Sequence, residues 1–181
     1  MSGYYGFLVP DLRPADVLLS AEQIRRRVAD VACDIGRDHP AGVHLVAVLN
    51  GAFIFLADLV RQLDGPVSLD FITLSSYTGG IASSGDVHLL KDLDGAIRDL
   101  DVVIVEDIVD SGVTLARLQE LLRMRGPRTL RTACLLNKPS RRRVEVPIDY
   151  IGFTIENHFV VGYGLDHADR YRNLPYIAVL R

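Results

Sequence analysis

The sequence predicts an α/β fold in which a mainly parallel, twisted sheet is flanked by helices. The run Val102–Val105 is continuously β-branched, as expected of a strand buried on both faces of a parallel sheet. A polar turn follows it and leads into leucines at helical spacing, Leu115, Leu118, Leu121 and Leu122. Strand and helix patterns also alternate along most of the chain, which favours parallel strands joined by crossover helices.

The composition is that of one globular domain. The chain has 181 residues, of which 49% are hydrophobic and 24% charged, enough for a full core. Its net charge of −3 gives no general attraction to nucleic acid or to anionic membranes, so we expect neither as a partner. The two cysteines, Cys33 and Cys134, lack metal-ligand spacing and are interpreted as buried thiols, which suits a reducing cytosol.

Two patterns bear on localisation. Met1–Ser20 lacks the basic start and the apolar segment of a signal peptide. The longest apolar stretch, Leu45–Ala57, contains Asn50 and is too short for a membrane span of about 20 residues. We therefore expect a cytoplasmic protein.

The first half of the chain predicts a helix, a strand, a helix and a strand. Ser20 and Gln23 form a capping-box pattern, and apolar residues then recur at helical spacing until Gly36, which is a stop signal. The further predicted elements are a strand at His44–Leu49, a helix at Gly51–Leu63 and a strand at Val67–Leu74.

The second half predicts mostly strands. Ser75–Gly85 has the composition of a mobile loop. The predicted strands are Val87–Leu90, Thr129–Leu136, Asp149–Thr154, Phe159–Val161 and Tyr176–Leu180. The last of these lie too close together for crossover helices, so they predict a small appended subregion.

The polar turn combines acids with groups that bind anions. Glu106 and Asp107 follow the strand directly, and Asp110, Ser111 and Thr114 come next. Open α/β sheets bind ligands at the carboxyl ends of their strands, and amides at a helix N-terminus favour anions. The two acids can accept hydrogen bonds from vicinal hydroxyls, so the turn suits a ribose 5-phosphate. The alternative is an ordinary strand–turn–helix unit with solvated acids.

This turn resembles the phosphoribosyl-pyrophosphate motif of the type I phosphoribosyltransferases. Together with Ser76-Tyr77, three C-terminal segments resemble the bacterial hypoxanthine and guanine members of that family: Leu135–Pro139, Phe159–Asp166 and Tyr171–Tyr176. The resemblance runs from about Asp16 to Arg181. It implies a single Rossmann-like domain over residues 16–181, with a small hood formed by C-terminal and N-terminal segments. Residues 1–15 lie outside it as an extension without an assigned role.

The resemblance implies roles for the residues of the turn. Asp110 is the candidate catalytic residue, the acceptor of the proton on purine N7. The predicted ribose and phosphate ligands are Glu106, Asp107, Ser111, Gly112, Val113 and Thr114. Ser111 stands where relatives often have threonine, which keeps the hydroxyl. The predicted ligands of Mg²⁺, the implied cofactor, are Glu106, Asp107 and Asp166.

A purine site is implied by Lys138, Phe159, Val160 and Asp166. The Lys138 ammonium has only donors and would bind a 6-oxo group while repelling a 6-amino group. Phe159 would stack on the base, and the carbonyls of Val160 and Asp166 would accept hydrogen bonds from it. Without the resemblance, Lys138 could be a strand-end lysine that reaches solvent, and Phe159 a core residue.

The pyrophosphate contacts are expected from Asn50, Gly51 and Arg172, and a lid from Ser76 and Tyr77. Many relatives have lysine where this chain has Asn50, which puts a direct charge contact there in doubt. The family often has a cis peptide at this loop, but the sequence leaves the isomer of Leu49–Asn50 open. The alternative for Arg172 is a surface arginine paired with Asp169.

The activity implied is Mg²⁺-dependent transfer of the 5-phosphoribosyl group to N9 of hypoxanthine, and also of guanine. The family forms homodimers and homotetramers, and the sequence does not separate the two. One alternative is an enzyme that prefers xanthine or accepts many 6-oxopurines. Another is a non-catalytic regulator that responds to phosphoribosyl pyrophosphate and binds nucleic acid. The run Arg141–Arg143 and the histidines His158 and His167 are interpreted as solvated surface residues.

Overall fold

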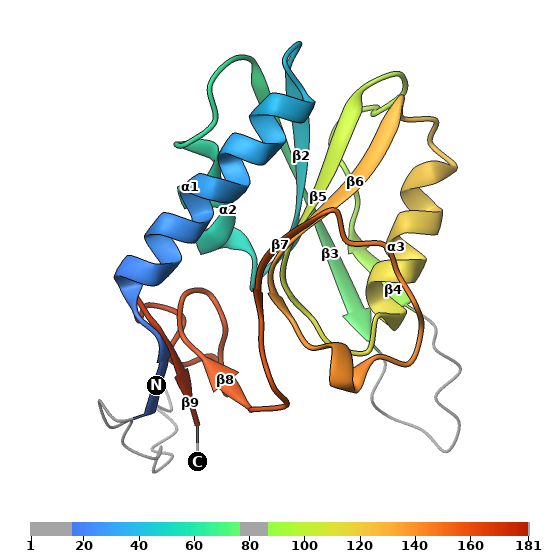
Figure 1. The fold of residues 1–181 in the computed structure, drawn as a ribbon. Helices are drawn as coiled ribbons and strands as arrows, with labels where there is room; N and C mark the ends of the chain where they lie inside the picture. Colours follow the sequence, from blue (N-terminus) through green and yellow to red (C-terminus); the bar gives the residue numbers. More distant parts are fainter. Residues whose placement is uncertain (1–15, 77–86, 181) are drawn as a thin grey trace, which may run out of the picture.

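A central sheet with the strand order β4-β3-β2-β5-β6-β7 organises the chain in this computed structural model, which describes residues 16–76 and 87–180 (Figure 1). Its strands are β2 (Val43–Leu49), β3 (Val67–Ser76), β4 (Val87–Lys91), β5 (Asp101–Val109), β6 (Thr129–Asn137) and β7 (Tyr150–Thr154). Neighbouring strands pair in parallel except β3 and β4, which are antiparallel. The predicted mainly parallel sheet is confirmed.

Helices cover both faces of this sheet (Figure 1). Helices α1 (Ala21–Asp38) and α2 (Phe53–Val60) lie on one face, and α3 (Val113–Arg123) lies on the other. Each face has its own apolar core: Val103 and Val105 of β5 belong to the first, and Val102 and Ile104 to the second. This alternation explains why the strand sequence is apolar at every position.

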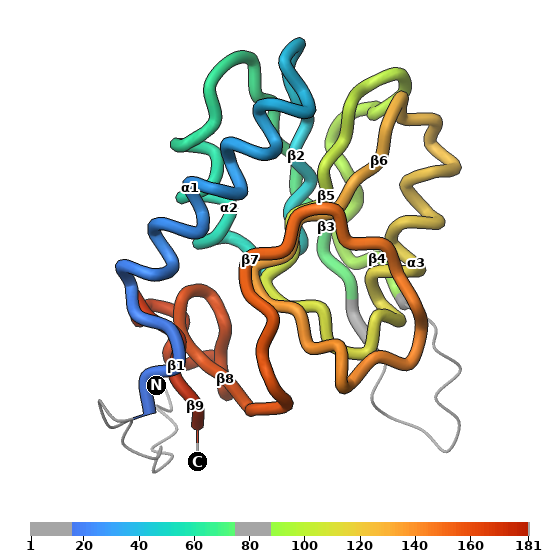
Figure 2. The backbone as a smooth tube through the Cα atoms, viewed as in Figure 1, coloured from blue at the N-terminus to red at the C-terminus, as the bar shows by residue number. Residues whose placement is uncertain are grey.

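A small second sheet joins segments from both ends of the chain and forms the hood. Its strands are β1 (Val17–Leu19), β9 (Ile177–Val179) and β8 (Val160–Val161), in that order and antiparallel. Figure 2 shows these three strands side by side next to the start of α1. The sequence predicted a hood but not β1, because a strand of three residues is too short to show a period.

Several predicted boundaries are wrong by a few residues. Gly36 lies inside α1, which continues to Asp38, because one glycine costs a helix only about 1 kcal/mol. Helix α2 begins at Phe53 rather than Gly51, after a turn in which the amide of Ala52 donates to the carbonyl of Val48 at 3.3 Å. Ser75 and Ser76 continue β3, because they pair with β4.

Strand β5 is also longer than predicted, and this changes the setting of the acids. Ile108 and Val109 continue the parallel pairing with β6, so Glu106 and Asp107 lie inside the strand rather than after it. One cysteine differs as well: Cys134 is buried, but Cys33 is exposed on α1. Within the described residues, no helix is both long and apolar enough to cross a membrane.

Candidate active site

The predicted general base and the predicted purine lysine come from neighbouring strands. The amide of Lys138 donates to the carbonyl of Val109 at 3.0 Å, and Val109 pairs with Asn137. Asp110 and Lys138 therefore follow β5 and β6 side by side. Because both strands run in the same direction, residues far apart in sequence meet at the carboxyl edge of the sheet, where such folds bind ligands.

The two acids of β5 are consecutive in the strand, so their side chains point to opposite faces of the sheet, and Glu106 is buried while Asp107 is partly buried. Glu106 is only 7% exposed, and burial, reinforced by the charge of Asp107, raises its pKa well above the usual value. Burial also raises the pKa of Asp107, while the amide of Ile108, which donates to the Asp107 carboxylate at 2.7 Å, opposes that rise. Burial makes these carboxyl groups hold their protons more tightly, which favours a site completed by hydroxyl donors or by a metal ion.

A narrow loop lies against Asp107. A β-carbon built on Gly51 would be 1.6 Å from Oδ2 of Asp107, so only glycine fits there. On its other side, a β-carbon on Gly164 would be 2.2 Å from the carbonyl oxygen of Gly51. The peptide bond between Leu49 and Asn50 is cis, which the sequence left open. The predicted pyrophosphate loop is thus held between β5 and the hood.

The hood brings Arg172 and Asp166 to this loop. Nη2 of Arg172 lies 2.7 Å from Oδ1 of Asp166, and Nη1 donates to the carbonyl of Gly164 at 2.7 Å. Asp169, the partner weighed in the surface alternative, is farther away at 3.7 Å. The charges of Arg172 and Asp166 also act on Asp107, the first lowering and the second raising its pKa. These three side chains therefore form one electrostatic cluster.

The start of α3 presents backbone amides without a side-chain cap. Its N-cap is Gly112, which has a positive φ of 82° and no side chain to satisfy the first N–H groups. Ser111 supplies only a long contact, 3.4 Å from its Oγ to the amide of Val113. Open amides at a helix N-terminus form an anion site, which matches the phosphate role predicted for residues 111–114.

The predicted purine residues lie between β6 and the hood. Lys138 is buried, and its Nζ donates to the carbonyl of His158 at 2.5 Å. Burial lowers the pKa of Lys138. Phe159 is 56% exposed and makes an edge contact with the ring of His167, with centroids 5.4 Å apart. Because Phe159 is exposed, it is not the core residue that the alternative proposed, and because Lys138 is buried, the alternative of a lysine that reaches solvent is wrong.

The run Arg141–Arg143 lies at the surface as predicted, with Arg141 and Arg143 exposed, but two of its arginines also contact Asp110. Nε of Arg141 donates to Oδ1 of Asp110 at 3.2 Å, and Nη1 of Arg142 donates to the carbonyl of Asp110 at 3.2 Å. The amides of Arg143 and Val144 both donate to the carbonyl of Ser111.

The remaining predicted site residues are Asn50 of the pyrophosphate loop and the lid residues Ser76 and Tyr77. Asn50 is exposed in the pyrophosphate loop, and Ser76 is the last residue of β3. Tyr77 and residues 1–15 lie outside the described residues, so the predicted lid contact and the domain boundary at residue 16 stay predictions.

The described side chains do not form a closed metal cage. In residues 16–76 and 87–180, no three His, Cys, Asp or Glu side chains gather so as to hold a metal ion by themselves. The charge of Asp166 acts to raise the pKa of Asp107, so these two carboxylates lie near each other. This pair fits Mg²⁺, which prefers few protein carboxylates together with oxygens of the substrate.

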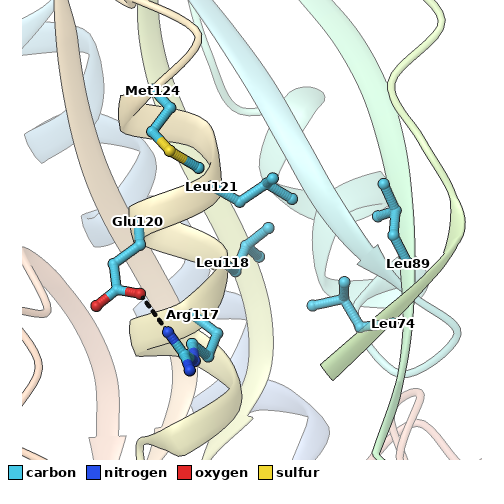
Figure 3. A pocket seen from close by; sticks show the side chains of 7 residues that line it. All are labelled: Leu74, Leu89, Arg117, Leu118, Glu120, Leu121 and Met124. Carbon is cyan, nitrogen blue, oxygen red and sulfur yellow. Dashed lines mark hydrogen bonds and ion pairs between the residues drawn. The ribbon is translucent and has the colours of Figure 1, made fainter. Parts of the chain in front are cut away.

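A separate apolar cavity of about 300 Å³ lies away from these residues, between α3 and the pair β3 and β4 (Figure 3). Leu118 and Leu121 of α3 point toward Leu74 and Leu89 across it, and its rim carries an ion pair between Arg117 and Glu120. Apart from that ion pair it offers little polar chemistry, so it does not compete with the carboxyl edge as the active site.

The fold is that of an α/β protein with a candidate ligand site at the carboxyl edge of its parallel sheet. Comparison makes this specific: a family model described as the phosphoribosyl transferase domain matches residues 15–168. The chain belongs to this family and is a transferase.

Similar proteins support the assignment over nearly the whole length. The chain is 47% identical over 165 residues to the hypoxanthine phosphoribosyltransferase of Escherichia coli K12, covering 90% of this chain and 93% of the relative. It is 49% identical over 180 residues to the hypoxanthine-guanine phosphoribosyltransferase of Mycobacterium avium, covering 94% and 89%. A crystal structure of a hypoxanthine-guanine phosphoribosyltransferase from Bacillus anthracis superposes with a TM-score of 0.89 at 43% identity, covering 94% of this chain and 100% of that one.

Proposed function

We propose that this enzyme serves purine salvage in the cytoplasm by transferring the 5-phosphoribosyl group of phosphoribosyl pyrophosphate to N9 of hypoxanthine, and also of guanine. The products are the nucleoside monophosphate and pyrophosphate. The observation that carries the proposal is the adjacency of Asp110 and Lys138, a carboxylate and a buried ammonium at the ends of β5 and β6. The names of the similar proteins support the same substrates.

The base would bind with its 6-oxo oxygen toward Lys138 and its face on Phe159. The ammonium is fixed by the carbonyl of His158 and has further protons to donate. Backbone carbonyls at Val160 and Asp166 would accept from a 2-amino group, which admits guanine. Asp110 would take the proton from N7 as N9 forms its bond to the ribose, the role of a general base.

The sugar phosphate would lie along β5 and the start of α3. Glu106 and Asp107 would accept hydrogen bonds from the ribose hydroxyls, and the amides at residues 111–114 would bind the 5-phosphate. The anomeric carbon becomes cationic as its bond to pyrophosphate breaks, so positioning and charge should supply most of the rate acceleration.

Pyrophosphate would bind at Asn50, Gly51 and Arg172. The guanidinium of Arg172 is held by Asp166 and Gly164 and has a fork suited to phosphate oxygens. Magnesium would be held by Asp107 and Asp166 together with oxygens of the substrate, and it would neutralise the charge of the leaving group; Glu106, also predicted as a ligand, does not gather with these two carboxylates into a group that could hold a metal ion.

We also propose a homodimer or homotetramer. Exposed large apolar side chains support association, among them Phe53 at 43% and Leu69 at 44% exposure. Light scattering on the purified full chain distinguishes the two assemblies from a monomer.

A spectrophotometric assay tests the proposed activity. The full chain is incubated with phosphoribosyl pyrophosphate, Mg²⁺ and one of hypoxanthine, guanine, xanthine or adenine. We expect turnover with hypoxanthine and guanine and none with adenine. A clear preference for xanthine would replace the proposed substrate, and inactivity with all four bases would overturn the proposal.

A further inference from the structure

The proposed reaction needs two opposite charges to stay apart. Asp110 and Lys138 follow adjacent strands, and the main chains that carry them are joined by the hydrogen bond from the Lys138 amide to the Val109 carbonyl. Their charges interact, since the Asp110 carboxylate acts to raise the pKa of Lys138. A direct ion pair between them would occupy both the proton acceptor and the donor that recognises the base.

In this structure each side chain has a different partner instead. Nζ of Lys138 donates to the carbonyl of His158, and Oδ1 of Asp110 accepts from Nε of Arg141. The Arg141 guanidinium is therefore the cation that satisfies Asp110 before a base is bound. Because arginine stays protonated in proteins, this partner is available at every relevant pH.

The backbone places Arg141 at this point. Residues Pro139–Arg141 form a short 3₁₀ helix, in which the amide of Arg141 donates to the carbonyl of Lys138 at 3.2 Å. The chain then returns to the phosphate turn, where the amides of Arg143 and Val144 donate to the carbonyl of Ser111 at 2.9 and 3.2 Å. Lys138 and Arg141 are thus the two ends of one tight turn, and the side chain of Arg141 reaches Asp110 from it.

The contact is suited to being exchanged during a reaction. The side chains of Arg141 and Asp110 are 51% and 41% exposed, and half-exposed ion pairs are weak. Asp110 can therefore leave Arg141 when the N7 proton of a base arrives. A buried pair with Lys138 would be harder to break, because its separation would leave uncompensated charge in a desolvated site.

We propose that Arg141 is a positioning residue that holds the Asp110 carboxylate away from the Lys138 ammonium, so that both groups stay free to bind the purine. This inference rests on the proposed function. It assigns a role to the first arginine of the run, whose side chain contacts Asp110, and none to the side chain of the third, Arg143.

Kinetics of the full-length enzyme provide the first test, with the variants R141A, R141K and R143A. In R141A we expect the KM for hypoxanthine to rise and kcat to fall, each by about fivefold to tenfold, while the KM for phosphoribosyl pyrophosphate stays within about twofold. R141K should recover most of the loss, and R143A should match the wild type. Equal effects of R141A and R143A, or a change confined to the sugar-phosphate KM, would overturn the inference.

A double variant separates positioning from a structural role. Removing the charge of Asp110 removes what Arg141 holds, so R141A should cost D110N far less than it costs the wild type. A purely structural effect of R141A would instead be the same in both backgrounds, and that result would contradict the inference.

Crystal structures of R141A and of the wild type give a readout without catalysis. We expect Asp110 in R141A to turn toward Lys138, with a carboxylate oxygen about 3 Å from Nζ. An Asp110 side chain that keeps its wild-type position would overturn the inference. Should the wild type be inactive with all four bases, the proposed function fails by itself, and these structures still decide the role of Arg141.

Discussion

Gly51 and Asp107 approach each other so closely that a single methyl group at Gly51 would overlap the carboxylate, at 1.6 Å from its Oδ2. Gly51 follows β2 and Asp107 lies within β5, and the two residues are 56 positions apart in sequence. Their contact joins the predicted pyrophosphate loop to the predicted ribose acids.

Replacing Gly51 with alanine should therefore damage both the site and its surroundings. We expect G51A to lose phosphoribosyl-pyrophosphate binding by at least about tenfold, measured by calorimetric titration, because loop and carboxylate must move apart. The matched control is G36A, where no atom lies within 4 Å of the added carbon and the residue is helical. G36A should retain activity and unfold at slightly higher denaturant, with a gain of about 0.5–1 kcal/mol. Normal binding by G51A would contradict the close approach.

Asp110 to asparagine should separate catalysis from binding. We expect kcat of D110N to fall by about 10²–10⁴-fold, because the amide cannot accept the N7 proton. The KM for phosphoribosyl pyrophosphate should change by less than about threefold, since no contact to the sugar phosphate is assigned to this side chain. Steady-state kinetics on hypoxanthine measure both quantities, and an unchanged kcat would remove Asp110 from the mechanism.

Lys138 to glutamine should relax the choice of base. The ammonium only donates, whereas a glutamine amide can also accept from a 6-amino group. We expect kcat/KM of K138Q for hypoxanthine to fall by about 10²-fold or more, and the ratio of adenine to hypoxanthine turnover to rise. Competition assays with both bases test this, and an unchanged ratio would place the 6-position elsewhere.

Phe159 to alanine should affect binding of the base far more than folding. The ring is 56% exposed, so its removal should change the free energy of unfolding by less than about 0.5 kcal/mol. Loss of stacking should raise the KM for hypoxanthine by about tenfold. Denaturant unfolding and kinetics are compared on the same preparation; a large loss of stability with normal KM would identify Phe159 as a packing residue after all.

Asp101, at the amino end of β5, should make the free energy of unfolding fall in acid. Hydrogen bonds from Arg128, at 2.9 and 2.5 Å, and from Thr129 at 2.9 Å lower its pKa from 3.8 to about 2. Because the pKa is lower in the folded chain, this stabilisation is complete above about pH 4 and disappears as the pH falls toward 2.

The variant D101N should therefore lose about 1–3 kcal/mol of unfolding free energy at pH 7 and show a smaller further loss between pH 4 and 2. Its control is D99N, because Asp99 lies two residues before Asp101 and at a positive φ of 62° that asparagine also tolerates. Urea unfolding at several pH values measures both variants. Parallel pH curves for the wild type and D101N would contradict the assigned cause.

Local patterns were sufficient for much of the fold. The β-branched run of β5, the capping box of α1 and the leucine spacing of α3 each depend on neighbouring residues, and all three elements were found. Errors arose where pairing with a distant segment decided the outcome. Val109 belongs to β5 because it pairs with Asn137, and Val17 lies in a strand because it pairs with Ala178.

The candidate site divides in the same way. Residues such as Asp110, Lys138 and Phe159 were expected from their motifs, and the structure brings them to one edge of the sheet. The contacts of Arg141 with Asp110 and of Gly51 with Asp107 were not expected, since a run of arginines and a single glycine carry no record of the segment that faces them.

By itself, then, the sequence determined the order of the helices and of the strands of the central sheet, the polar turn before α3 and the family, because periodicity and short motifs are properties of nearby residues. Only the tertiary structure decided which charged side chains meet, which arginine of the run contacts the carboxylate of Asp110, and how long each strand is. The reason is that strand pairing and side-chain burial depend on contacts between segments that are far apart in sequence. The free energy of each such contact depends on how those segments pack in the folded chain.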